Sequence, residues 1–230
     1  GSVRHQPLDR RPHASLRHPR TRGRTTAVKT LRPITGVSAV VGGLSWTSAA
    51  LVHNSLPQGC VGDACTLGGP MRGASALGVG LLVLAGAFLA ISLAGLLLLA
   101  RREAGVGRAG VSGGVACLVG LILLGAAGVT SSFIDSNWEH MPFLVAPGVI
   151  FLSIGLALVA WSVWRARVLP GSLAATVLVT LLLLPVANEQ TSLVLLAIPF
   201  GLAWTLVGAW MLGTVRQAVP QVGVSARGLP

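Results

Sequence analysis

Charged residues are scarce in this chain: Asp, Glu, Lys and Arg make up 10% of its 230 residues. An ordinary soluble domain carries about 25% charged residues, so the composition excludes that class. The stretch 73–100 contains no charged side chain, and neither does 109–133. Because about 20 apolar residues span the hydrocarbon core of a bilayer, each stretch is long enough to cross a membrane.

The alternation of polar and apolar residues that marks barrel strands is also absent, so the long apolar runs predict helices. We expect an all-α, polytopic transmembrane bundle of six helices within 33–215, between an N-terminal tail 1–32 and a C-terminal tail 216–230. The short connections should make consecutive helices pack antiparallel. The predicted helices are 33–53, 73–100, 109–133, 142–164, 168–187 and 193–215.

No charged residue lies in the middle of a predicted span, which argues against proton-coupled or ion-coupled transport. The single lysine, Lys29, precedes the first span, so a retinal Schiff base is excluded. The glycines of 105–110 follow no strand, and a dinucleotide-binding turn is excluded as well.

The few charges are distributed unevenly. The three connections predicted on the outer side hold one basic residue, Arg72, and four acids, whereas the other sixteen basic residues lie on the side of the termini. Basic residues near helix ends stay in the cytoplasm, so we predict a cytoplasmic (plasma) membrane protein with both termini inside. The sixteen arginines against one lysine suggest a GC-rich bacterial genome. Gly42-Gly43 interrupts the first apolar run, and we expect this helix not to be cleaved as a signal sequence.

Nine basic residues fall within 1–32, a stretch without apolar periodicity. Such a segment cannot bury enough surface to fold, so we predict a disordered cytoplasmic tail. Its expected partner is the anionic inner leaflet of the bilayer, in preference to RNA or a protein. No nucleic-acid partner is expected.

Small residues at helical spacing predict close helix packing. Gly86, Ala90 and Ala94 form one such ridge in the second predicted helix, and Ala116 and Gly120 form another in the third. These ridges serve packing within the chain or contact with another membrane protein or a second copy. Bends are expected at Pro147, Pro185 and Pro199, and interfacial anchoring at Trp161, Trp164 and Trp204.

Polar side chains gather at the predicted outer side. The candidates for an outer-face site are His53, Asp135, Glu139, His140 and Glu189. They could be ordinary polar loop residues, a general acid and base, or ligands of a divalent metal or haem through His53 and His140. Because HxxxH and HExxH spacings are absent, we predict no catalytic residue and no cofactor, and the metal or haem site is the alternative.

Cys60 and Cys65 lie in the long first outer connection. In an oxidising compartment two such thiols are expected to pair, and free or metal-bound thiols are the alternative. The spacing is not the CxxC of a redox enzyme. Cys117 lies within an apolar helix and is interpreted as a packing residue.

The third predicted helix runs into Phe133-Ile134-Asp135, His140 follows, and the last helix is rich in tryptophan. In these features residues 33–215 resemble small uncharacterised six-helix integral membrane proteins of bacteria and archaea. The resemblance implies the six-helix architecture and no defined activity.

We therefore expect a non-enzymatic accessory or interaction subunit. The alternatives are a small transporter or lipid-handling permease and an outer-face metal-binding or catalytic protein that uses His53, Glu139 and His140. The transporter hypothesis predicts a cavity lined by Thr176, Thr180, Asn188 and Thr205.

Overall fold

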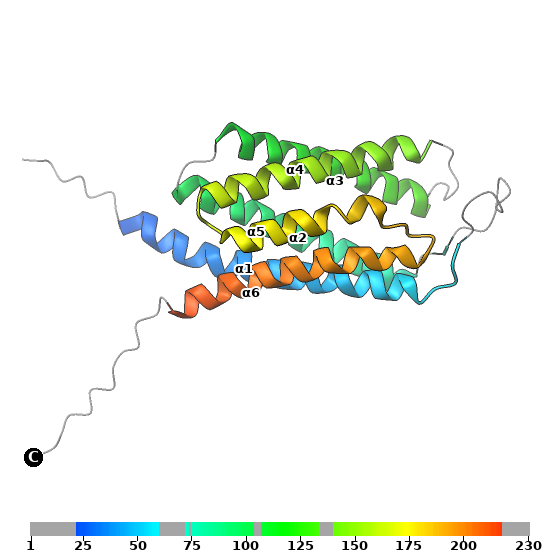
Figure 1. The fold of residues 1–230 in the computed structure, drawn as a ribbon, viewed down its shortest axis with the longest axis horizontal. Helices are drawn as coiled ribbons and strands as arrows, with labels where there is room; N and C mark the ends of the chain where they lie inside the picture. The colour runs from blue at the N-terminus through cyan, green and yellow to red at the C-terminus, as the bar shows by residue number, and fades with distance from the viewer. Residues whose placement is uncertain (1–21, 60–71, 74, 104–106, 134–139, 218–230) are drawn as a thin grey trace, which may run out of the picture.

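The computed structural model describes residues 22–59, 72–73, 75–103, 107–133 and 140–217, and these residues form helices and turns without a strand (Figure 1). The elements are α1 (Arg22–Asn54), α2 (Ala76–Glu103), α3 (Arg108–Phe133), α4 (Pro142–Arg165), α5 (Gly171–Leu181), the 3₁₀ helices η1 (Leu184–Val186) and η2 (Ser192–Ala197), and α6 (Ile198–Gln217).

Five helical segments are long and apolar enough to cross a membrane, with mean hydropathies between 1.3 and 2.6. They are Thr30–Asn54, Ala76–Glu103, Arg108–Thr130, Pro142–Arg165 and Ser192–Val215. The all-α class is thus confirmed for the described residues. The helix α1 begins at Arg22 rather than at residue 33, because a helix can continue into a polar stretch that hydropathy does not detect. The rest of the predicted disordered tail, residues 1–21, lies outside the described residues.

The segment predicted as one continuous helix over 168–187 is interrupted: its apolar helical stretch is Gly171–Val186, and α geometry within it ends at Leu181. The helix α5 covers 11 residues, about 16 Å at 1.5 Å per residue, against a hydrocarbon core of about 30 Å. Beyond it, the N–H groups of Leu182 and Leu183 bond to carbonyls three residues back, at 3.2 Å each. Pro185 lacks an N–H and disfavours α geometry in the residue before it, so the chain continues as the 3₁₀ helix η1.

A second proline shapes the last segment. Residues 192–197 form the 3₁₀ helix η2, and α-helical geometry begins at Ile198. Pro199 therefore occupies the first turn of α6, where its missing N–H costs nothing. In contrast, α4 continues through Pro147.

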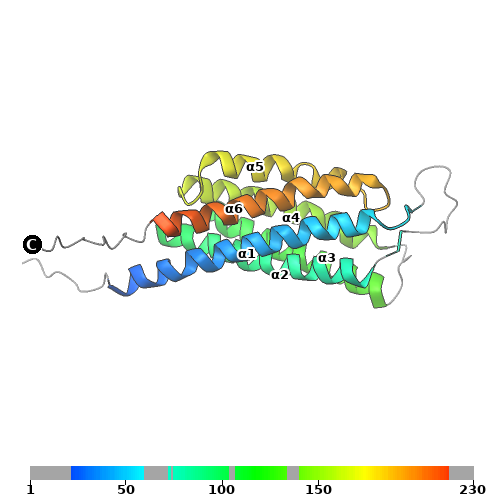
Figure 2. The same ribbon diagram turned by 90° about the horizontal axis from the view of Figure 1, so that it is seen from below.

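The helices form two groups. The first consists of α1 with α2 on one side and α6 on the other, and the second is the antiparallel pair of α3 and α4. The short α5 contacts both α4 and α6, while α2 touches α3 and α4 at few positions. Figures 1 and 2 show the start of α1 and the end of α6 at the same end of the bundle. We call this the terminal end and its opposite the loop end.

Glycines set the contact between α1 and α6. A methyl group added at Gly201 would lie 2.6 Å from the carbonyl oxygen of Gly43, and one added at Gly36 would lie 3.1 Å from that of Gly208. Both helices thus place glycines seven residues apart at the point where their backbones meet. Such close approach is the main source of attraction between helices in lipid, because lipid is as apolar as leucine.

The α3–α4 pair uses the same arrangement. An added methyl group at Gly120 would lie 2.8 Å from the carbonyl oxygen of Gly148, and one at Gly155 would lie 2.8 Å from that of Gly113. The predicted small-residue ridge of the third helix therefore packs within the chain at Gly120. The ridge of the second helix does not, since a methyl group at Gly86 would meet nothing within 4 Å and Ala94 is exposed.

At the terminal end, Arg32 of α1 and Glu103 of α2 form an ion pair of 2.6 Å. Nearby, α4 ends in a Schellman motif: the N–H of Arg167 bonds to the carbonyl of Trp164 and that of Val168 to the carbonyl of Val163. Arg167 takes the left-handed position with φ of 56°, where glycine is usual. The ion pair joins α1 to α2, and the Schellman motif ends α4.

Candidate functional site

The densest polar cluster of the described residues lies at the loop end, around Arg72. This residue precedes α2, and its neighbours come from the end of α1 and from the turn between η1 and η2. Although arginine is normally exposed, Arg72 is only 7% exposed. Burying a charge is costly unless it is hydrogen-bonded, so its partners define the cluster.

All the recorded partners of the Arg72 guanidinium are main-chain carbonyls. Its Nε donates to Pro57 at 3.2 Å and its Nη2 to Leu56 at 3.2 Å. Its Nη1 donates to both Glu189 at 3.0 Å and Thr191 at 3.1 Å. One side chain thereby joins the end of α1 to the turn before η2.

The main chain around Arg72 strengthens the same junction. The side-chain oxygen of Gln190 accepts a hydrogen bond from the Arg72 N–H at 2.6 Å, and the main-chain carbonyl of Gln190 accepts one from Gly59 at 3.0 Å. A side chain at Gly59 would collide with Gln190 and with the Arg72 nitrogen. We call Leu56, Pro57, Gly59, Arg72, Glu189, Gln190 and Thr191 the Arg72 clasp.

His53 contributes to this junction. Its Nε2 lies 3.1 Å from the carbonyl oxygen of Glu189, so Nε2 carries the proton and donates. The His53 ring thus reaches the main chain of Glu189. The Glu189 residue itself is exposed. This arrangement holds loops together and places no base beside an acid.

The other predicted site residues lie elsewhere. His140 is exposed in the turn before α4, with its ring 6.0 Å from that of Phe143. Asp135, Glu139, Cys60 and Cys65 lie outside the described residues, so the disulfide stays a prediction. Among the described residues, no group of three or more His, Cys, Asp or Glu side chains could hold a metal ion.

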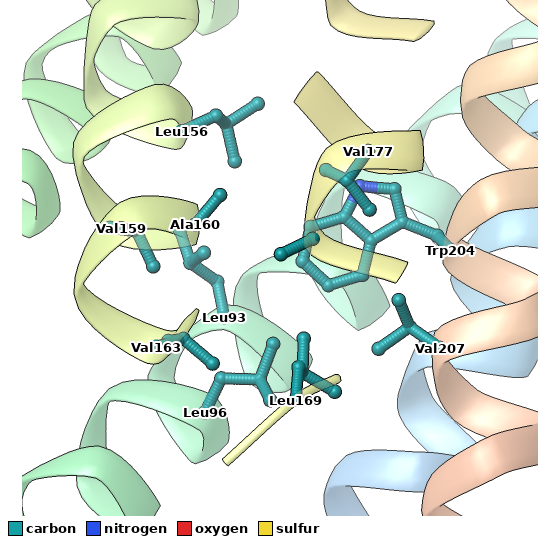
Figure 3. Close-up of a pocket in the computed structure, with 11 residues that line it drawn as sticks. Leu93, Leu96, Leu156, Val159, Ala160, Val163, Leu169, Val177, Trp204 and Val207 are labelled. Atoms are coloured by element: carbon teal, nitrogen blue, oxygen red, sulfur yellow. The ribbon is translucent and has the colours of Figure 1, made fainter. Parts of the chain in front are cut away.

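A small cavity of about 20 Å³ lies inside the bundle, where α2, α4, α5 and α6 meet (Figure 3). Its walls are apolar, and none of Thr176, Thr180, Asn188 and Thr205 lines it. Thr176, Thr180 and Thr205 instead bond to carbonyls of their own helices. This cavity therefore differs from the one that the transporter hypothesis predicts.

Trp204 forms one wall of this cavity and is 4% exposed, so its predicted role as an interfacial anchor is wrong. Its indole nitrogen has no hydrogen-bond partner in the described part of the chain. The environment is buried because side chains of α2, α4 and α5 enclose the cavity that Trp204 lines.

Trp204 belongs to a short sequence repeat that the sequence analysis missed. The segments Gly43-Leu44-Ser45-Trp46-Thr47 and Gly201-Leu202-Ala203-Trp204-Thr205 match at four of five residues. They meet across the antiparallel α1–α6 contact, so that each glycine faces the other segment. The Trp46 indole donates to the carbonyl of Ala197 at 3.0 Å, whereas the Trp204 indole lies at the apolar cavity. A search for short repeats would have found this signal.

No known protein family, curated protein or solved structure matches this chain. The residues themselves therefore carry the functional argument.

Proposed function

We propose that this chain is a non-enzymatic interaction subunit of the cytoplasmic membrane, with the terminal end inside. Five apolar helices long enough to cross a membrane support this location. The shorter apolar stretch Gly171–Val186 adds a sixth passage between the two ends, which brings the α1 start and the α6 end to the same end of the bundle. The basic residues Arg101, Arg102, Arg165 and Arg167 are exposed at the terminal end, as expected for a cytoplasmic surface.

The observation that carries the proposal is an unfilled seam between α2 and α3 toward the loop end. The two helices meet at Leu97 of α2 and Gly114 of α3. A methyl group added at Gly114 would lie 3.2 Å from the Leu97 side chain. Eleven residues are about three helical turns, so Gly86 and Gly125 lie on the same faces of their helices as Leu97 and Gly114. A methyl group at Gly86 or Gly125 would nevertheless meet nothing within 4 Å.

Burial along α2 shows the same change. Leu82, Leu93 and Ala100 share one face of the helix by their spacing of 11 and 7 residues. Ala100 is 0% exposed, Leu93 9% and Leu82 48%. This face is therefore covered near the terminal end and open near the loop end. We call Leu82, Gly86, Gly125 and Gly128 the outer seam.

A transmembrane helix of a partner protein fits this seam best. Small residues allow helix backbones to approach closely, and the chain uses glycines for this purpose at the α1–α6 and α3–α4 contacts. In the outer seam the same residue type has no counterpart within the described residues.

Photo-crosslinking in the membrane of the native host tests the proposal. A photoreactive side chain at Leu82 should yield one defined adduct with a second membrane polypeptide. The same group at Leu118, which is 59% exposed on α3, should yield none. When the Leu82 crosslinking variant also carries Gly86→Leu, the adduct should disappear, because the larger side chain fills the outer seam. Equal adducts at Leu82 and Leu118, or none at Leu82, would contradict the proposal.

A further inference from the structure

A second opening between α2 and α3 lies at the terminal end, on the other side of the Leu97–Gly114 contact. It is a groove of about 330 Å³ lined by Leu97, Leu98, Arg101, Gly110 and Val111. Figure 2 shows α2 and α3 running along one side of the bundle, away from α5. Leu98 and Val111 in its lining are 45% and 59% exposed, so the groove opens on the outside of the bundle, the surface that faces lipid in a membrane.

The walls of this groove combine two kinds of chemistry. Leu97 and Leu98 on α2 and Val111 on α3 are apolar, while Arg101 places a cation at the same opening. Arg102 and Arg108, which flank the groove in sequence, are also exposed. The acid closest in sequence, Glu103, is already paired with Arg32. The positive charge of the groove is thus not neutralised by this carboxylate.

We propose that the groove binds one anionic phospholipid of the inner leaflet. The lipid phosphate meets the Arg101 guanidinium, whose planar donors match phosphate oxygens. An acyl chain lies along Leu97, Leu98 and Val111. Basic pockets between transmembrane helices on the cytoplasmic side are suited to anionic headgroups. The apolar walls favour a phospholipid over a free phosphate ion, because only the lipid has an acyl chain to place against them.

Native mass spectrometry of the purified full chain in detergent provides the test. With equal amounts of dioleoyl phosphatidylglycerol and dioleoyl phosphatidylcholine present, the chain should retain one phosphatidylglycerol. Arg101→Gln should raise the dissociation constant for that lipid at least fivefold. Arg167→Gln, which removes an exposed arginine from the same end of the bundle, should leave it unchanged. Equal losses in both variants would show unspecific attraction to charge and overturn the proposal.

A second pair of variants tests the apolar wall without changing charge. Val111→Trp should lower phosphatidylglycerol retention because it fills the groove. Val115→Trp, one turn along α3 and 58% exposed, should not. Displacement of the lipid by millimolar inorganic phosphate would overturn a phospholipid as the occupant, and so would retention unaffected by both Arg101→Gln and Val111→Trp.

Discussion

Arg72 resolves an exception in the charge pattern of the chain. It is the only basic residue that the sequence assigns to the outer side. Its side chain is buried and joins the end of α1 to the turn before η2, so it is not a surface charge. Its guanidinium donates to four main-chain carbonyls of the Arg72 clasp. Lysine could not satisfy this set, because its ammonium has three donors at one point whereas arginine spreads five over a plane.

Arg72→Gln should lower the free energy of unfolding by about 2–4 kcal/mol, since hydrogen bonds to a charged group contribute about 1.5–3 kcal/mol each and part of this gain offsets desolvation. Denaturant titration of the purified protein in detergent micelles measures the change. The exposed Arg165 provides the control, and Arg165→Gln should have no comparable effect. Equal stability of the two variants would show that the clasp contributes nothing.

Arg167 is strained in the left-handed conformation at the end of α4. Replacing it by glycine should raise the free energy of unfolding by about 1 kcal/mol, because glycine adopts positive φ without the steric cost of a Cβ atom. The same titration measures the gain. Arg167→Gln keeps the Cβ atom and should give no gain; a similar increase in both variants would assign the effect to charge instead.

At the scale of helices, close glycine contacts determine which elements pair. Gly201→Ala should lower the free energy of unfolding by about 1–3 kcal/mol, because its methyl group would press on the Gly43 carbonyl at 2.6 Å. Gly213→Ala in the same helix meets nothing within 4 Å and should not destabilise. Thermal unfolding of both variants in detergent compares them, and a loss of equal size in Gly213→Ala would contradict the packing argument.

The sequence predicted the long helices well and their irregularities poorly. Hydropathy finds α2, α3 and α4 because a membrane requires continuous apolar runs. It does not show where α5 stops, since the break depends on hydrogen-bond geometry around Pro185 while the composition stays apolar. The sequence also did not show which face of each helix packs against a neighbouring helix. Gly86 and Gly120 have similar sequence surroundings, yet only Gly120 is covered.

Considered as a whole, the molecule is two groups of helices joined by a narrow contact and by α5. This arrangement explains why an outer-face site could be predicted only in part. His53 and Glu189 belong to elements of the first group and its turn, where they meet, whereas His140 precedes α4 in the second group. Sequence places all three at one end, but only the packing of the groups decides which of them approach.

The proposed orientation can be tested with single cysteines in a chain carrying Cys60→Ser and Cys65→Ser. Cysteine at Gln58, exposed at the loop end, should react with a membrane-impermeant maleimide in intact cells. Cysteine at Ser172, exposed at the start of α5, should react only after the cells are permeabilised. The buried native Cys117 should remain unlabelled in both. Labelling of Ser172 in intact cells would contradict the orientation.

The pairing of α1 with α6 also bears on the order of synthesis. Contacts between segments far apart in sequence form late, and Gly43 meets Gly201 only after nearly the whole chain has left the ribosome. The α3–α4 hairpin can close as soon as it emerges. The surface of α1 around Gly36 and Gly43 stays uncovered until α6 has been made. A nascent chain stalled before α6 would therefore present this face to insertion chaperones, and quality control would distinguish it from the finished protein there.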